Sequence, residues 1–178
     1  MHDDRRLIEG RLRRTLQRIE DAVWSAPVPV ELGRWDAPGE PVPVDEGLTA
    51  PYAAAQVGDR WGPPWGTTWW RVRAQVPQEH AGRPVDLRLD LGFDPLRTGF
   101  HVEGLVYRAD GTPVKGLNPR NQWVRVADSA AGGEEVELFV ESASNPLLLG
   151  GGGFDFRPSP LGDPDTAGSE PMYRVVRA

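Results

Sequence analysis

The chain has 178 residues and a net charge of −6, with 21 glycines, 18 prolines and no cysteine. This length suits one domain with a hydrophobic core, and the negative charge argues against a nucleic-acid or anionic-membrane partner. The absence of cysteine excludes disulfides, thiolate metal sites and a cysteine nucleophile, and the lack of a long apolar run or an apolar leader predicts a cytoplasmic location.

One amphipathic helix is predicted over residues 4–24. Apolar side chains recur there at spacings of four, four, three and four residues, which places them along one side of a helix with 3.6 residues per turn. Asp3 or Asp4 is expected to cap the start of the helix, and Glu9 and Arg13 lie one turn apart, where they can pair. This apolar stripe consists of Ile8, Leu12, Leu16, Ile19 and Val23.

Arginines flank the apolar stripe, and acidic residues are interleaved with them. A basic amphipathic helix is one sign of membrane or calmodulin binding. The mixed charge of this helix instead favours packing against a sheet, against another domain or against a second copy of the chain.

Residues 25–60 are rich in proline, which cannot donate a hydrogen bond to a β-sheet. We expect this segment to run as extended chain and turns over the surface of the domain, with Trp35 holding the loop in place.

An aromatic turn follows, in which four of the seven tryptophans fall within residues 61–70. Each tryptophan can remove roughly 150–250 Å² of surface from water, so the turn predicts a buried anchor or an aromatic contact surface. Residues 68–76 alternate as a half-buried strand does, which directs Trp69 and Trp70 to opposite faces.

Further strands are predicted in series, and together they indicate a β-sandwich over residues 61–178. Asp110 and Gly111 lie between two apolar runs and predict a hairpin. The chain stops in or just after its last strand, so we expect it to be a piece of a longer protein. These strands cover residues 85–91, 100–108, 113–117, 122–127, 135–142 and 172–177.

Candidate catalytic or metal-binding groups are few. His101 and Glu103 lie two residues apart on a predicted strand and share a face, but a metal would need a third ligand. The chain has neither the Gly-x-Ser-x-Gly turn of a serine hydrolase nor the Gly-Lys-Ser/Thr sequence of a phosphate loop. We therefore expect no catalytic and no metal-binding residue in this chain.

Three motifs occur in a characteristic order: Trp-Gly-Pro-Pro-Trp-Gly-Thr-Thr-Trp-Trp-Arg-Val at 61–72, Glu-Gly-Leu-Val-Tyr-Arg-Ala-Asp-Gly-Thr-Pro-Val-Lys-Gly-Leu at 103–117, and Leu-Phe-Val-Glu-Ser-Ala-Ser-Asn at 138–145. This set resembles the N-terminal domain of the cytosolic and bacterial type of α-mannosidase, in family 38 of the glycoside hydrolases. The predicted helix and the loop around Trp35 also fit. The resemblance implies a mainly β fold, a galactose-binding-like jelly-roll β-sandwich preceded by one N-terminal amphipathic α-helix.

The resemblance also implies that the intact protein is a zinc-dependent retaining α-mannosidase. Its zinc ligands and nucleophilic aspartate belong to a later domain, so no catalytic residue of the family maps onto a position of this chain. No cofactor is expected in this fragment, and zinc is expected in the catalytic domain.

Two functions are compatible with this resemblance. In the first, the chain is an accessory domain whose partner is the catalytic domain of the same polypeptide or a second subunit. In the second, the domain binds a mannoside through exposed rings and nearby polar groups. The solvent exposure of the aromatic turn discriminates between them. The candidate contact residues, for a sugar or for a domain interface, are Trp61, Trp65, Glu103, Asn118, Asn121, Trp123 and Asn145.

Overall fold

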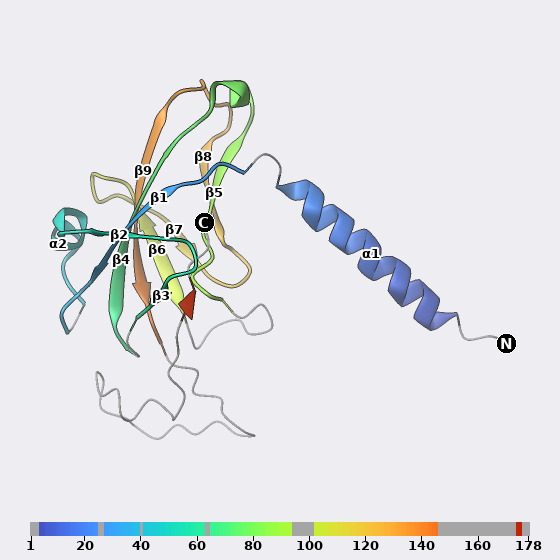
Figure 1. The fold of residues 1–178 in the computed structure, drawn as a ribbon, viewed down its shortest axis with the longest axis horizontal. Helices are drawn as coiled ribbons and strands as arrows, with labels where there is room; N and C mark the ends of the chain where they lie inside the picture. Colours follow the sequence, from blue (N-terminus) through green and yellow to red (C-terminus); the bar gives the residue numbers. More distant parts are fainter. Residues whose placement is uncertain are drawn as a thin grey trace, which may run out of the picture.

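The computed structural model describes residues 4–24, 27–39, 41–62, 65–93 and 102–145, together with the backbone of residues 174–175. This part of the chain is mainly β, with antiparallel sheets and one long N-terminal helix, as predicted (Figure 1). The six-stranded sheet has the order β2-β1-β4-β9-β6-β7, and two-stranded sheets join β5 to β8 and β3 to β10. The elements are α1 (Arg5–Val23), β1 (Glu31–Asp36), α2 (Val44–Thr49), β2 (Ala53–Ala55), β3 (Arg60–Trp61), β4 (Thr67–Gln75), the 3₁₀-helix η1 (Gln78–His80), β5 (Val85–Arg88), β6 (Glu103–Tyr107), β7 (Pro113–Leu117), β8 (Trp123–Ala127), β9 (Glu135–Ala143) and β10 (Arg174–Val175).

Helix α1 forms where it was predicted, and it points away from the sheets (Figure 1). Asp4 occupies the N-cap position without a side-chain hydrogen bond, so the predicted capping by its carboxylate is wrong; Asp3 lies outside the described residues. Glu9 pairs with Arg13 at 3.9 Å, as predicted, and with Arg5 at 2.9 Å.

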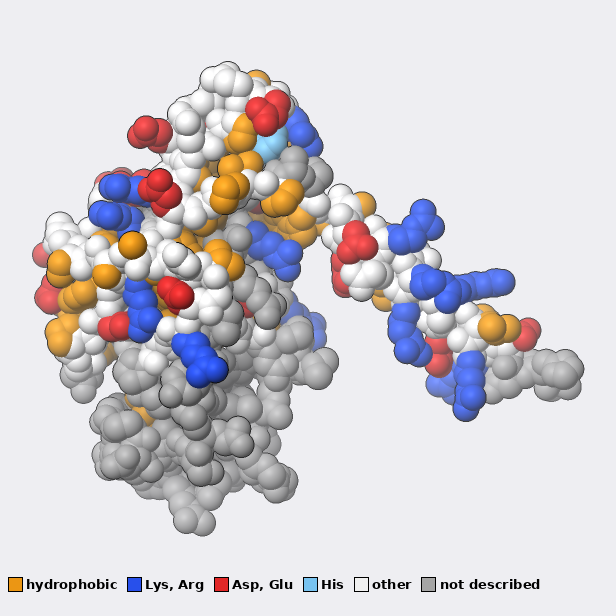
Figure 2. Space-filling model, viewed as in Figure 1, with side chains coloured by type: hydrophobic (Ala, Val, Ile, Leu, Met, Phe, Trp, Pro, Cys, Tyr) orange, Lys and Arg blue, Asp and Glu red, His pale blue; other side chains and the backbone are white. Residues whose placement is uncertain are grey.

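The apolar stripe of α1 is exposed, and no residue of the helix is buried. Arginines surround it, which gives the helix the strongly basic surface seen in Figure 2. No described helix has the length and apolar character that crossing a membrane requires. The packing of α1 on a sheet, one of the alternatives above, is therefore not found among the described residues.

The proline-rich segment is more regular than predicted. It contributes β1, β2 and α2, and β1 pairs along its whole length with β4, as Leu32 opposite Val72 illustrates. The sandwich therefore begins near residue 31 and not at residue 61. The reason is local: residues 31–36 contain no proline, so their N–H groups are free to pair although prolines are frequent on both sides. Trp35 lies on this strand and packs against a buried cluster, and does not hold a loop.

The six-stranded sheet has packed side chains on both faces. Its inner face packs against the β5–β8 pair, with Trp70 and Val140 meeting Leu87 and Val124 in the main core. Its outer face is covered by the segment that carries α2 and forms a smaller cluster around Trp69. The two neighbouring tryptophans of β4 therefore point to opposite faces, as predicted, and both are at most 1% exposed.

The later strands follow the predicted pattern. Leu87, Leu89 and Leu91 are buried in alternation, and β9 pairs with β4 along all nine of its residues. The Asp-Gly hairpin also forms, since Gly111 adopts a positive φ of 82° and the Asp110 carboxylate accepts a hydrogen bond from the backbone of Thr112. Of the predicted final strand only Arg174–Val175 lies among the described residues, and this part pairs with β3.

Candidate functional site

The aromatic turn is used mainly to build the core. Trp61 is 1% exposed and meets Trp70 edge to face, with ring centres 5.7 Å apart and planes at 87°. Its Nε1 donates to the carbonyl of Leu91 at 3.2 Å. No face of the Trp61 ring is open, so this candidate residue is an internal anchor and offers no platform for a sugar.

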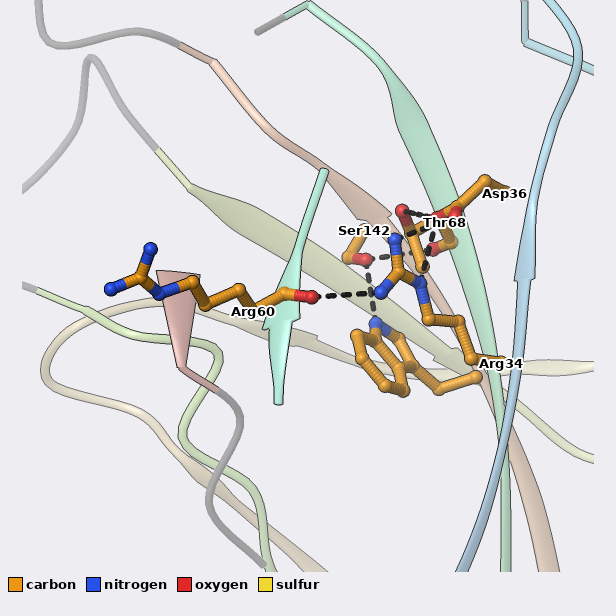
Figure 3. A network of polar contacts seen from close by, with 6 residues as sticks. Arg34, Asp36, Arg60, Thr68 and Ser142 are labelled. Atoms are coloured by element: carbon orange, nitrogen blue, oxygen red, sulfur yellow. Dashed lines mark hydrogen bonds and ion pairs between the residues drawn. The ribbon is translucent and has the colours of Figure 1, made fainter. Parts of the chain in front are cut away.

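A polar network fixes the strand that carries Trp61 (Figure 3). Arg34 on β1 donates from Nε and Nη2 to both oxygens of Asp36, at 3.0 and 2.6 Å, and from Nη1 to the carbonyl of Arg60 at 2.8 Å. Thr68 Oγ1 donates to the Asp36 carboxylate at 2.6 Å. The guanidinium of Arg34 thereby joins β1, β3 and β4 at one point.

The network continues into the core through Ser142 (Figure 3). Its hydroxyl donates to the carbonyl of Thr68 at 2.7 Å and accepts from Trp70 Nε1 at 2.9 Å. The Nε1 of Trp70 and the carbonyl of Thr68 are buried, so the Ser142 hydroxyl supplies hydrogen bonds that these groups can no longer make with water. These contacts position the aromatic turn.

Trp65 is held in a left-handed conformation. Its φ of 64° is rare for a residue with a β-carbon, and its N–H donates to the carbonyl of Ser144 at 2.9 Å. Gly62 precedes it with φ of 78°, and a β-carbon there would overlap the Ser144 side chain. The Trp65 ring is half-buried, and its Nε1 is buried without a partner among the described residues. Trp65 is therefore a fixed turn residue with limited ring exposure.

One candidate tryptophan has an exposed side chain, and it directly follows the turn between β7 and β8. Trp123, at the start of β8, is 37% exposed. Asn118 and Asn121 close the turn through paired backbone hydrogen bonds of 3.1 and 2.9 Å, and Asn121 Nδ2 donates to the carbonyl of Gly116 at 3.0 Å. Asn118 Oδ1 accepts from the backbone of Arg120. The structure thus brings three of the predicted residues together on one turn.

Strand register brings Glu103 and Asn145 toward the same end of the sandwich. Glu103 is exposed and pairs with Ala143, two residues before the half-buried Asn145. The next residue of β6, Gly104, pairs with Leu117, which directly precedes the β7–β8 turn. The candidate residues therefore gather at one end of the sheet, although Trp61 lies in the core beneath it.

Lys115 is a member of this site that sequence reasoning missed. Its Nζ lies 3.3 Å from the centre of the Trp123 ring, and the guanidinium of Arg125 lies 6.0 Å from it. Arg125 is also paired with Asp86 at 2.6 Å and with Asp128 at 2.8 Å, which raises its pKa above the usual range. One signal in the sequence could have pointed to Lys115, because it is the only lysine of the chain among nineteen arginines.

The described side chains at this end of the sandwich supply a ring, amides and an ammonium. Such groups recognise ligands by stacking and hydrogen bonding. No group of three or more histidine, aspartate or glutamate side chains in the described ranges is arranged to hold a metal. His101, proposed with Glu103 as a pair that shares a face, lies outside those ranges.

Comparison with known proteins gives consistent results. Residues 28–178 match the family model described as the jelly roll domain of alpha-mannosidase. The chain is 34% identical over 143 residues to Alpha-mannosidase 2C1 of Homo sapiens and 32% identical over 143 residues to the same protein of Mus musculus. Each match covers 78% of this chain and 12% of the relative, so the chain spans about an eighth of the length of the curated relatives that it matches.

Proposed function

The chain belongs to the family of α-mannosidase jelly roll domains, and from this membership we propose that it is the non-catalytic N-terminal accessory domain of a longer α-mannosidase. One observation carries the proposal: the match to a jelly roll domain model extends over residues 28–178, while the match to the relatives named α-mannosidase covers only 12% of their length. The intact protein would hydrolyse α-mannosides.

Zinc and the retaining mechanism belong to this proposal for the intact enzyme, a glycoside hydrolase of family 38. The side chains described in this chain do not fit a zinc site, because none of them form a suitable group of three ligands. The zinc ligands would lie in the catalytic domain, which is the proposed partner of this chain. A cytoplasmic location agrees with the absence of cysteine.

Helix α1 supports an accessory role. Six of the nine exposed large apolar side chains in the described chain lie on it. A helix of 19 residues that buries no side chain is only marginally stable in water. A partner that covers the apolar stripe would therefore stabilise α1. We place that contact with the catalytic domain, and a homo-oligomer formed through α1 is the other arrangement.

The test compares the intact mannosidase with a version that lacks residues 1–178, helix α1 included, and then adds the 178-residue chain back as a separate polypeptide. We expect the truncated enzyme to lose thermal stability or solubility, and the added chain to restore part of it. The chain alone should not cleave a chromogenic α-mannoside in the presence of zinc. Turnover by the chain alone, or a truncated enzyme of unchanged stability and assembly, would contradict the proposal.

Carbohydrate contact is the second candidate function, and the exposure of Trp123 favours it. An exposed ring next to the Asn118–Asn121 turn is the kind of surface on which a mannoside can stack. Titration with mannose and short mannosides, followed by tryptophan fluorescence and amide NMR shifts, tests it. Saturable binding that Trp123→Ala abolishes without loss of fold supports sugar contact, and the absence of binding contradicts it.

A further inference from the structure

We propose that Lys115 and Trp123 form a binding site for a pyranose sugar that carries an anionic group. This inference rests on the sugar-contact function above and narrows its ligand class. The evidence is the surroundings of the Lys115 ammonium and its position over the Trp123 ring.

Lys115 differs from Arg125, the other cation near the Trp123 ring, because it has no acidic partner among the described residues. Arg125 is paired with Asp86 and Asp128, and elsewhere Arg73 is paired with Glu137. Among the described residues the ammonium of Lys115 contacts the Trp123 ring and no carboxylate. An ammonium that lacks a counter-ion is a ready partner for an anion brought by a ligand.

The position of the ammonium selects against neutral sugars. At 3.3 Å from the ring centre it occupies one face of the indole, where the C–H groups of a stacked sugar would otherwise lie. A neutral sugar on that face must displace the ammonium and lose the cation–π contact. An anionic sugar compensates for the displacement, because its carboxylate or phosphate accepts a charge-assisted hydrogen bond from the same ammonium.

The neighbouring turn supplies groups for sugar hydroxyls. Asn118 uses its Oδ1 and Asn121 its Nδ2 to hold the turn. The Nδ2 of Asn118 and the Oδ1 of Asn121 have no partner among the described residues, which leaves one donor and one acceptor on the turn that leads into Trp123. A ring, an ammonium and two amide groups are groups of the kinds that contact sugars.

The Lys115–Trp123 contact also joins β7 to β8, so a purely structural role has to be separated from binding. The chain offers a direct probe of this contact, because reductive methylation with carbon-13 formaldehyde labels only Lys115 and the N-terminal amine, and it keeps the positive charge. The methyl signal of Lys115 should be shifted by the ring current of Trp123. The labelled chain is titrated with sodium glucuronate, with mannose 6-phosphate, with methyl α-mannoside and with sodium acetate.

We expect glucuronate or mannose 6-phosphate to move the Lys115 signal saturably in the millimolar range, and the comparison of these two distinguishes a carboxylate from a phosphate ligand. Methyl α-mannoside should bind at least tenfold more weakly, and acetate should not saturate. Added salt should weaken the binding of the charged sugars, since the contact is electrostatic. Equal shifts with acetate would show a simple anion contact and would overturn the proposal.

Variants complete the test, with binding to the unlabelled chain followed by amide NMR shifts. Lys115→Gln and Trp123→Leu should each reduce binding of the anionic sugar at least tenfold, with an unchanged fold by amide NMR. Arg73→Gln, which removes one positive charge from the six-stranded sheet, should leave binding unchanged. If methyl α-mannoside binds as tightly as glucuronate, sugar contact stands and this inference fails. If no sugar binds, both fail, and the accessory role is still tested separately by truncation.

Discussion

Gly47 of α2 lies against the indole of Trp69 so closely that a β-carbon at position 47 would overlap the ring. Trp69 is fully buried, and its other neighbour is Tyr107, stacked with ring centres 5.5 Å apart. The absence of a side chain at residue 47 is therefore what allows α2 to cover the outer face of the sheet. The hydroxyl of Tyr52 donates to the carbonyl of Gly47 at 2.6 Å and holds it there.

Gly47→Ala should accordingly destabilise the domain. Alanine favours a helix by up to about 1 kcal/mol over glycine, but overpacking of a buried site costs about 1–3 kcal/mol, and the overlap is with a rigid ring. Urea unfolding measures the difference. Gly10→Ala on α1 is the control, because a β-carbon there would only make an ordinary contact with the Arg14 side chain. Since no residue of α1 is buried, this change should leave the urea midpoint of the sandwich within error. A stabilised Gly47→Ala protein would show that α2 does not pack on Trp69.

Leu89→Ala should cost about 2–5 kcal/mol of unfolding free energy, because it leaves a cavity in the main core. Leu89 is 2% exposed and belongs to the main core cluster. The adjacent Arg88 is exposed and lies over the Trp24 ring at 5.7 Å, so Arg88→Ala should change stability by no more than about 0.5 kcal/mol. Equal losses in a urea melt would mean that the inward and outward positions of this strand are misassigned.

Ser142 and Ser144 form a matched pair near the end of β9, since both are fully buried, but among the described residues only the hydroxyl of Ser142 has hydrogen-bond partners. Ser142→Ala should destabilise by about 1–3 kcal/mol, because Trp70 Nε1 and the carbonyl of Thr68 lose their partner. Ser144→Ala removes a hydroxyl that has no partner among the described residues, and it should be neutral or stabilising. The melting temperature should therefore fall for Ser142→Ala and not for Ser144→Ala. Equal shifts of the two melting temperatures would contradict the hydrogen-bond network around Ser142.

The stability of the domain should fall between pH 10 and 12. Burial, and then the hydrogen bond to Glu141, raise the pKa of Tyr107 to about 12. The unfolded chain releases this proton near pH 10, so it is the folded state that retains the proton between these values. The stabilisation that protonated Tyr107 provides is complete below about pH 10, and it is lost as the pH rises through the pKa of Tyr107 in the folded state. Tyr107→Phe should flatten this decline in unfolding free energy, and an equally steep decline would exclude Tyr107 as its source.

Local patterns in the sequence were enough to predict most of the fold. The 3.6-residue spacing predicts α1, and strict alternation predicts the inward residues of β5 and β9. The opposite orientation of Trp69 and Trp70 also follows from alternation alone. The strand β1 is not predicted by the pattern, because prolines on both sides mask a proline-free stretch of only six residues.

The candidate site was harder to predict, because ring exposure depends on contacts between distant segments. Trp61 is closed off by Trp70 and by the backbone of Leu91, thirty residues away. Lys115 lies on a different strand from Trp123, and no short-range pattern joins them. Asn118 and Asn121 lie only a few residues before Trp123 in the sequence, so one short turn is enough to bring the three together.

Strands β4 and β9 lie next to each other in the middle of the six-stranded sheet, and they join positions seventy residues apart, as Trp70 opposite Val140 illustrates. Contacts between such distant positions form slowly, because a long loop must close before they contribute. During synthesis the chain therefore carries Trp69 and Trp70 unprotected until β9 has left the ribosome. A product truncated before residue 135 would present an unpaired β4 edge with two large rings, a typical starting point for aggregation. The domain is thus most vulnerable before its last long strand is made.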